Sequence, residues 1–262
     1  PVRDWIGLAC TCHSLHMQCC NALGRDGMLH ERETLIYLAK LSEQAARYDD
    51  MLEHITLAAA TATAHDPLTH EGLDLLSVAF KMKTGAFRKT IRALAAIREQ
   101  VEGRRLELVS GYLNKVVLDL QGICERAVCL LETLTSVHQG CAEAVMFCHK
   151  MRADQLRYLA ECLTGQQKLA YSEAAQEAYH DADASVRALP ATHPIRLGTA
   201  LSCATFLYEV QGQRSKACEQ ARKAFDDAFV ELDTLDEESY RDSTVIMQLL
   251  RDNLTMWTGE SS

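Results

Sequence analysis

Nine consecutive residues predict a helix with one polar face: Lys150-Met151-Arg152-Ala153-Asp154-Gln155-Leu156-Arg157-Tyr158. At helical spacing, four of them fall at i, i+4, i+7 and i+8, on one side of the helix: Lys150, Asp154, Arg157 and Tyr158. A guanidinium fork, a carboxylate that orients it and a phenol donor together suit recognition of an anion, above all phosphate. The alternative, and the commoner outcome at this spacing, is a row of ion pairs that faces solvent.

The composition around this stretch favours an all-helical protein. The chain has 262 residues, of which 48% are hydrophobic and 24% charged, enough for one large or two small domains. Only 4 prolines are present, and Pro67, Pro190 and Pro194 lie between long periodic segments. The net charge of -9 argues against nonspecific binding to nucleic acid or to anionic membranes. No apolar run approaches the ~20 residues that span a bilayer.

The cysteines give no firm sign of a metal site. The chain has 11 of them, and most are single residues on helical patterns, where buried free thiols are common. An N-terminal group could be read as metal ligands: Cys10, Cys12, His13, His16, Cys19 and Cys20. Its spacing matches no standard zinc pattern. We therefore expect no metal and no cofactor, and reduced thiols in a cytoplasmic protein.

The hydrophobic periodicity predicts nine helices joined by short loops. They are expected at about 31–48, 49–62, 70–102, 104–134, 141–164, 167–188, 194–211, 213–233 and 237–257. Residues 1–30 differ in composition, and we expect Gly24 and Gly27 to break any helix before Met28. The predicted organisation is an N-terminal extension at 1–30, partly helical around 3–22 or disordered, a helical domain at 31–258 and a short tail at 259–262.

Two further helices carry side chains that could complete a binding site. Lys81 and Arg88 are seven residues apart and therefore share a face. Together with Arg157 and Tyr158 they could hold a doubly charged phosphate. The last helix has an apolar stripe that one amide interrupts: Ile246, Leu249, Asn253, Met256 and Trp257. This stripe is either core packing or the wall of a groove in which the amide binds a ligand's backbone.

A self-association surface is predicted near the N-terminus of the helical domain. Leu41 and Ala45 share an apolar face. Charged and aromatic residues that could complement it are Arg47, Asp50, Tyr112, Lys115 and Asp119. The alternative is packing within one chain. The chain has no nucleophile elbow, phosphate-binding glycine loop, HExxH pair or CxxC pair, so it is not expected to be an enzyme.

Several long segments, taken in order, resemble the 14-3-3 proteins over residues 32–258. They are Lys40–Met51, Leu75–Lys81, Arg157-Tyr158-Leu159, Thr192–Gly198, Leu232–Thr244 and Gln248–Trp257. The resemblance implies nine antiparallel helices that form a cup-shaped protomer with an amphipathic groove. It also implies a homodimer, or a heterodimer with a paralogue, whose grooves bind phosphoserine or phosphothreonine segments of client proteins in signalling.

The resemblance also implies roles for individual residues. The phosphate pocket would consist of Lys81, Arg88, Arg157 and Tyr158. Supporting polar residues would be Lys150, Asp154 and Glu209, with Asn253 holding the peptide backbone. The apolar wall would consist of Gly198, Leu201, Ile246, Leu249, Met256 and Trp257. The dimer pairs would be Arg47 with Asp119 and Asp50 with Lys115, around Leu41, Ala45, Thr90 and Tyr112.

The chain departs from the family pattern at positions that bear on binding. Ser202 stands where the family usually has a second backbone-binding Asn, and its short hydroxyl predicts weaker peptide binding. Thr205 replaces a Val, and Phe87 replaces an arginine beside Arg88. The alternative function is therefore a scaffold or structural homologue that has weakened or lost phosphopeptide binding.

Overall fold

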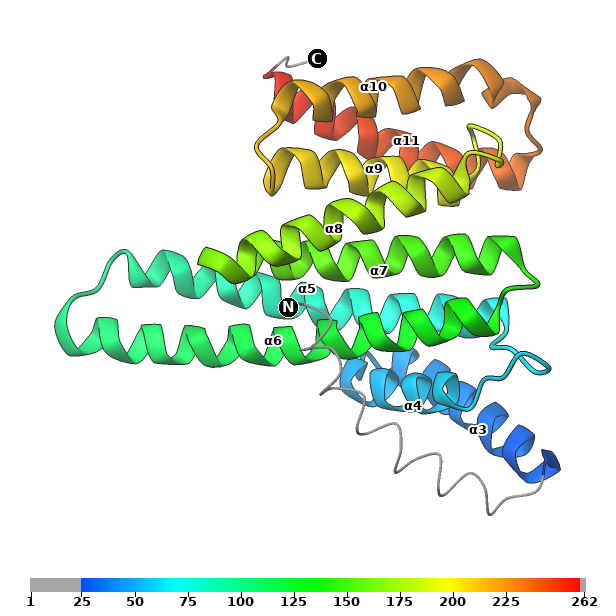
Figure 1. Ribbon diagram of the computed structural model, residues 1–262, viewed down its shortest axis with the longest axis horizontal. Helices are drawn as coiled ribbons and strands as arrows, with labels where there is room; N and C mark the ends of the chain where they lie inside the picture. The colour runs from blue at the N-terminus through cyan, green and yellow to red at the C-terminus, as the bar shows by residue number, and fades with distance from the viewer. Residues whose placement is uncertain (1–24, 260–262) are drawn as a thin grey trace.

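A computed structural model describes residues 25–259, with side chains from Glu31 onward, and this part of the chain is a set of nine α-helices (Figure 1). The helices are α3 (Arg25–Gln44), α4 (Tyr48–Ala60), α5 (His70–Arg98), α6 (Gly103–Val137), α7 (Ala142–Cys162), α8 (Gly165–Val186), α9 (Pro194–Glu209), α10 (Arg214–Glu231) and α11 (Glu237–Thr258), with a short 3₁₀ helix at Leu232–Thr234. Between residues 25 and 259 the only β pairing is an isolated bridge, Thr63 with Asp66. The all-α prediction is therefore confirmed.

The predicted helix boundaries agree with the structure to within a few residues, except at the start. We expected Gly27 to break a helix, but it lies inside α3, which begins at Arg25. The predicted helix at 3–22 and the Cys and His group at 10–20 lie outside the described residues.

Local sequence explains several helix ends. Thr69 and Asp236 accept hydrogen bonds from the first turns of α5 and α11, and Gly259 ends α11 in the left-handed conformation.

Three hydrophobic clusters hold the helices in place. The first joins α3 to α7 around Leu76, the second joins α5 to α9 around Leu156, and the third joins α9 to α11 around Leu250. Helix α7 contributes to the first two clusters, and α9 contributes to the last two. Since each of these helices buries side chains in two clusters, its rotation about its own axis is determined by packing. The rotation of α7 in turn determines which direction its polar face points.

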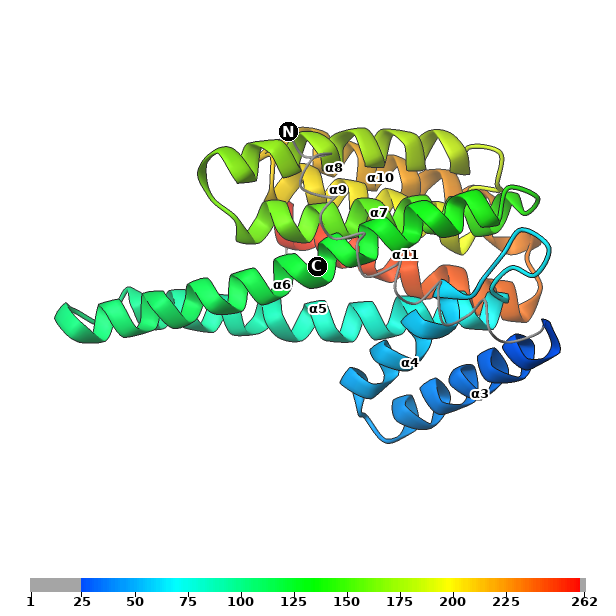
Figure 2. The ribbon, with the colours of Figure 1, turned by 60° about the horizontal axis from the view of Figure 1, so that its bottom comes forward.

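Helices α5 and α6 form a hairpin whose tip extends beyond the other helices (Figures 1 and 2). No other helix of the described residues covers the tip, and Ile97, which continues the apolar pattern of α5, is 45% exposed. Helical spacing places Ile97 on the apolar side of α5, but it cannot show where the helices that cover that side end. None of the helices in the described part is both long and apolar enough to cross a membrane.

Candidate functional site

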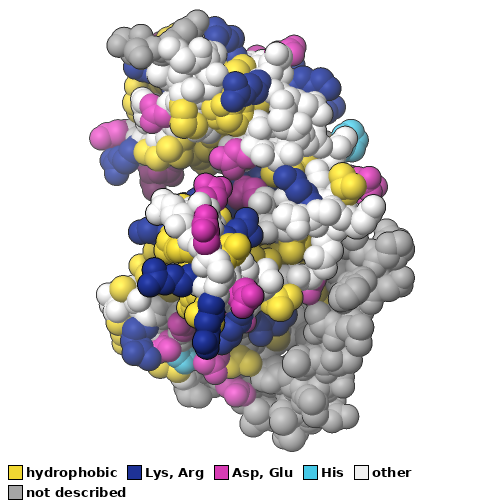
Figure 3. All heavy atoms as spheres, turned by 90° about the vertical axis from the view of Figure 1, so that its left-hand side faces the viewer, with side chains coloured by type: hydrophobic (Ala, Val, Ile, Leu, Met, Phe, Trp, Pro, Cys, Tyr) yellow, Lys and Arg dark blue, Asp and Glu magenta, His cyan; other side chains and the backbone are white. Residues whose placement is uncertain are grey.

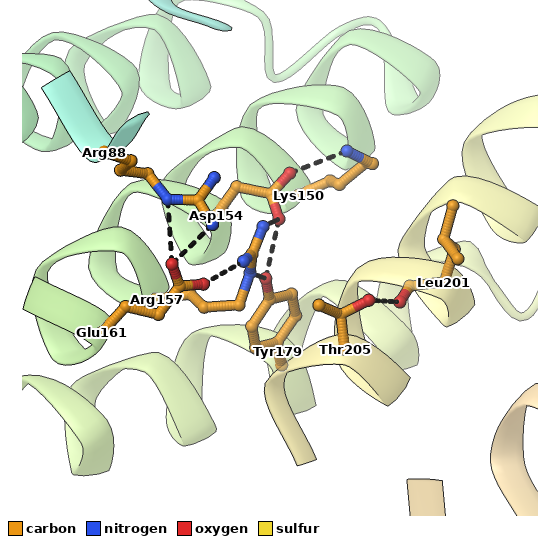
Figure 4. Close-up of polar contacts among 8 residues, drawn as sticks. All are labelled: Arg88, Lys150, Asp154, Arg157, Glu161, Tyr179, Leu201 and Thr205. Carbon is orange, nitrogen blue, oxygen red and sulfur yellow. Dashed lines mark hydrogen bonds and ion pairs between the residues drawn. The ribbon is translucent and has the colours of Figure 1, made fainter. Parts of the chain in front are cut away.

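The polar face of α7 lies inside the protein. Asp154 and Arg157 are only 8% and 6% exposed. Lys150 Nζ donates to Asp154 Oδ2 at 2.8 Å, and Arg157 Nη2 lies 3.7 Å from Asp154 Oδ1 (Figure 4). The ion pairs that the spacing suggested are therefore present. The alternative, a row of ion pairs that faces solvent, is therefore wrong for Asp154 and Arg157.

One carboxylate joins the two arginines of the site. Arg88 on α5 donates to Glu161 Oε2 from Nε at 2.8 Å and from Nη2 at 2.5 Å. Arg157 Nη1 donates to the other oxygen, Oε1, of the same carboxylate (Figure 4). Glu161 therefore holds both guanidinium planes in place. Sequence reasoning missed Glu161, although its position four residues after Arg157 on the same face of α7 was a usable signal.

A tyrosine of α8 completes the hydrogen bonding of the buried pair. The Tyr179 hydroxyl accepts from Arg157 Nε at 3.0 Å and donates to Asp154 Oδ1 at 2.7 Å. Tyr179 itself is 2% exposed and packs against Phe206 of α9, with ring centroids 5.3 Å apart. Sequence reasoning missed Tyr179 too. No pattern within α8 marks it, because its partners lie on another helix.

Tyr158 lies next to both guanidinium groups. Its ring centroid is 4.3 Å from the Arg88 Cζ atom and 4.5 Å from the Arg157 Cζ atom, within the range of cation–π attraction. Burial raises the pKa of the Tyr158 hydroxyl to about 12, so at neutral pH this group keeps its proton and remains a donor.

The buried charges of the site have strongly shifted pKa values. Burial alone would raise the pKa of Asp154, but the nearby Lys150 and Arg157 charges outweigh burial and lower it to about 2. Burial likewise opposes the charge on Arg157. Tyr179, Asp154 and Glu161 outweigh that effect and hold the pKa of Arg157 well above its usual value. Both groups are therefore ionised at neutral pH.

Lys81 differs from the other three residues of the predicted phosphate pocket. The structure brings Arg88, Arg157 and Tyr158 together, as described above. Lys81 is exposed and makes no hydrogen bond or ion pair with any residue of the described chain. It shares a face of α5 with Arg88, seven residues away, so it remains free to approach a ligand from the same helix.

Helix α9, which carries several of the predicted groove residues, packs against α7 beside the charged cluster. A Cβ atom placed on Gly198 would lie 3.2 Å from Lys150 Cε, so the glycine leaves the space that Lys150 occupies. Ser202 and Asn253 are half-buried, and the side chain of neither forms a hydrogen bond with a described residue. The Thr205 hydroxyl donates to the Leu201 carbonyl at 2.8 Å (Figure 4). Thr205 therefore adds less polarity to the groove than its sequence suggested.

The apolar residues of α11 separate into exposed and buried members. Leu249 and Met256 are exposed, and Ile246 is half-buried. Trp257 is buried in the third cluster and stacks on Tyr208 with centroids 4.7 Å apart, so it is not an exposed wall residue. A space-filling view shows a hollow between the part formed by α9 to α11 and the part formed by α5 and α6 (Figure 3). Hydrophobic and charged side chains are mixed along its sides.

The residues predicted for self-association lie on the surface of the chain. Leu41 is 42% exposed and Tyr112 is 56% exposed. The other members, Ala45, Thr90, Lys115 and Asp119, are exposed as well. The alternative that Leu41 and Tyr112 pack within one chain is therefore wrong. Arg47 and Asp50, which we expected to reach a partner, pair with each other at 2.5 Å in the single chain.

A family model and several known relatives point to the same protein family. The family model described as "14-3-3 protein" matches residues 38–258. The 14-3-3-like protein GF14 iota of Arabidopsis thaliana is 42% identical over 243 residues, covering 91% of this chain and 90% of that protein. The 14-3-3-like protein GF14-C of Oryza sativa subsp. japonica is 44% identical over 87% of this chain and 91% of its own length. The 14-3-3-like protein 2 of Caenorhabditis elegans is 42% identical over 88% and 93%.

Proposed function

The chain belongs to the 14-3-3 family, and from that premise we propose that it binds phosphoserine or phosphothreonine segments of client proteins. Proteins of this family are non-enzymatic adaptors, and this chain is not an enzyme. The observation that carries the proposal is the arrangement of Arg88 and Arg157 on one shared carboxylate, beside the phenol of Tyr158.

The free donors of the two arginines support this proposal. Each guanidinium has five N–H groups. Arg88 uses Nε and Nη2 on Glu161, which leaves both N–H groups of Nη1. Arg157 uses Nε on Tyr179 and Nη1 on Glu161, and its Nη2 has only the 3.7 Å approach to Asp154. The forks are thus held in position with donors to spare, so a phosphate needs little rearrangement to bind.

We assign the groove roles on the same basis. Lys81 would add a fourth contact to the phosphate, while Lys150 and Asp154 would support Arg157. Asn253 and Ser202 would face the peptide backbone, since both have unused hydrogen-bonding groups in the described part of the chain. Leu201, Ile246, Leu249 and Met256 would cover the peptide's side chains.

We propose residues 31–258 as the binding domain, with 1–30 as an extension and 259–262 as a tail. We also place the protein in the cytoplasm, which suits the thiols of Cys124, Cys148 and Cys162, none of them in a disulfide.

A phosphoserine peptide is expected to bind about 100-fold more tightly than its unphosphorylated twin. Two charge-assisted hydrogen bonds of about 1.5 kcal/mol each account for that ratio. Fluorescence titration of both peptides measures this ratio.

In the same titration Ser202→Asn is expected to tighten binding of both peptides by about three- to tenfold, because the amide adds a hydrogen bond to the peptide backbone. Equal, negligible binding of both peptides by the natural chain would instead support the scaffold alternative.

We further propose that the chain dimerises through the exposed surface of Leu41, Ala45, Thr90 and Tyr112. Arg47 would pair with Asp119 of a second copy and Asp50 with Lys115, after their pairing within the chain is broken. That pairing is solvent-exposed and so costs little to break. Two grooves in one dimer would give avidity for clients with two phosphorylated sites of suitable spacing.

Light scattering at micromolar concentration is expected to show particles of about 58 kDa, twice the 29.2 kDa chain. Leu41→Glu should shift the mass toward one chain, because a charge on an apolar interface has no partner there. Val245→Glu, at an exposed position on α11, is the matched control and should leave the mass unchanged. A mass of about 29 kDa for the natural chain would rule out the dimer at that concentration.

A further inference from the structure

A separate cavity lies between the end of α8, the first half of α9 and α10, apart from the candidate phosphate site. Its volume is about 590 Å³, which is typical of small-molecule sites. On α9 its lining includes Arg196 and Ala200, which are one turn apart and therefore share a face. Gly198, two residues from each, lies on another side of α9, where it faces Lys150 of α7. None of the residues that line the cavity belongs to the phosphate site.

The most buried part of the cavity lining is apolar. Val186, Ala191 and Leu197 are buried, and Ala200 and Ala224 are half-buried. Because an alanine side chain ends at Cβ, the three alanines leave space that larger residues would fill. The apolar body of a ligand that enters this space would be removed from water, which favours binding.

Charged side chains complete the lining of the cavity. Arg187 donates to Asp183 Oδ2 from Nε at 3.2 Å and from Nη2 at 2.8 Å, so these two charges are paired. Lys223 and Asp227 are one turn apart on α10, and neither forms an ion pair with a described residue. With Arg196, the lining holds three cations and two carboxylates. The cavity therefore has one positive charge in excess, in a chain whose net charge is -9.

Arg196 is held in one orientation without a carboxylate partner among the described residues. Its side chain is half-buried, and its Nη1 donates to the Leu189 carbonyl at 2.7 Å. A guanidinium has five N–H groups, so the other four make no hydrogen bond within the described part of the chain. Two parallel donors of a guanidinium match the two oxygens of a carboxylate, which makes this pair both strong and specific.

We propose that this cavity binds a small organic monocarboxylate, whose carboxylate pairs with Arg196 and whose apolar body lies against the alanines and Leu197. Lys223 would add a second positive charge. A single negative charge balances the excess of the lining, whereas a phosphate dianion would leave an unbalanced negative charge in a cavity that already holds Asp183 and Asp227. This site is independent of the proposed phosphopeptide binding, since the two share no residue.

NMR titration of the isotope-labelled full chain with naphthoate, naphthamide and naphthyl phosphate tests the proposal. The three probes share one apolar body and differ in charge. Naphthoate is expected to bind with a Kd on the order of 0.1 mM, as suits a ligand of its size, and to shift the backbone amides of Ala191, Ala200 and Ala224. Naphthamide should bind about tenfold more weakly, because it forms no charge-assisted hydrogen bond with Arg196. Naphthyl phosphate should shift these amides less than naphthoate at equal concentration.

Variants of the lining separate the charge from the shape of the cavity. Arg196→Gln should lower the affinity for naphthoate about tenfold, to that for naphthamide. Ala200→Leu keeps every charge and the bond from Arg196 to the Leu189 carbonyl but fills the cavity, so it should abolish binding of both probes even if Arg196→Gln fails to fold. Arg222→Gln is the matched control, because Arg222 is exposed beside Lys223 in sequence but does not line the cavity. It should leave both affinities within about twofold of the natural values.

Three results would overturn the proposal. Equal affinity of the natural chain for naphthoate and naphthamide would show that the carboxylate is not recognised. Amide shifts confined to α5 and α7 would place naphthoate at the phosphate site. Unchanged naphthoate binding by Ala200→Leu would show that the ligand lies outside this cavity. None of these results bears on phosphopeptide binding, which the peptide titration measures separately.

Discussion

Replacement of Arg157 by Ala is expected to remove the phosphate-dependent part of peptide binding and also to destabilise the fold. Arg157 is 6% exposed, and it contacts Asp154, Glu161 and Tyr179 at once. Removing it takes two or more donors from the phosphate and leaves two partly buried carboxylates short of a partner. Loss of one member of a buried pair lowers the free energy of unfolding by about 3–5 kcal/mol. We expect affinity for a phosphoserine peptide to fall about 100-fold.

Urea unfolding and peptide titration test the two effects separately. Arg152→Ala is the matched control, because Arg152 lies on the same helix but pairs with Glu132 near the surface at 3.1 Å. Its loss should cost at most about 1 kcal/mol. Arg157→Lys keeps the charge without the planar fork and should fall between the two. Unchanged stability of Arg157→Ala would show that the carboxylates have other partners in solution.

Replacement of Asp154 by Asn is expected to remove a pH-dependent part of the stability. The pKa of Asp154 is lowered from 3.8 to about 2 in the folded chain, despite the opposing effect of burial. A carboxyl with a depressed pKa stabilises the fold fully above its unfolded pKa, and this contribution is lost as pH falls from about 4 toward 2. The shift corresponds to a contribution on the order of 2 kcal/mol at neutral pH.

Unfolding free energies at several pH values check this prediction. Asp154→Asn should be less stable than the natural chain at pH 7, and the two should converge as pH approaches 2. Asp183→Asn is the control, because Asp183 forms an exposed i,i+4 pair with Arg187 at 2.8 Å and should change stability by at most about 1 kcal/mol. A constant difference between Asp154→Asn and the natural chain at all pH values would contradict the assignment.

Much of the architecture could be predicted because it depends on local pattern. Apolar residues at helical spacing marked eight of the nine helices to within a few residues, and glycine or proline stood at most breaks. The ninth, α3, begins before Gly27, since the cost of one glycine in a helix is only about 1 kcal/mol. The spacing of Lys150, Asp154 and Arg157 showed that they share a face but did not show whether that face is buried.

The sequence by itself determined the family, the helices and the positions of Arg88, Arg157 and Tyr158 on their faces. Only the tertiary structure decided that these residues meet, and which groups complete the site. Glu161 bonds Arg88 from 73 residues away, and Tyr179 bonds Arg157 from another helix. Such contacts depend on how α7 and α9 are rotated by the clusters on both of their sides, which no local spacing encodes. The same packing set two carboxylates, Asp154 and Glu161, against three cations, so most of the positive charge that the sequence suggested for this site is already paired.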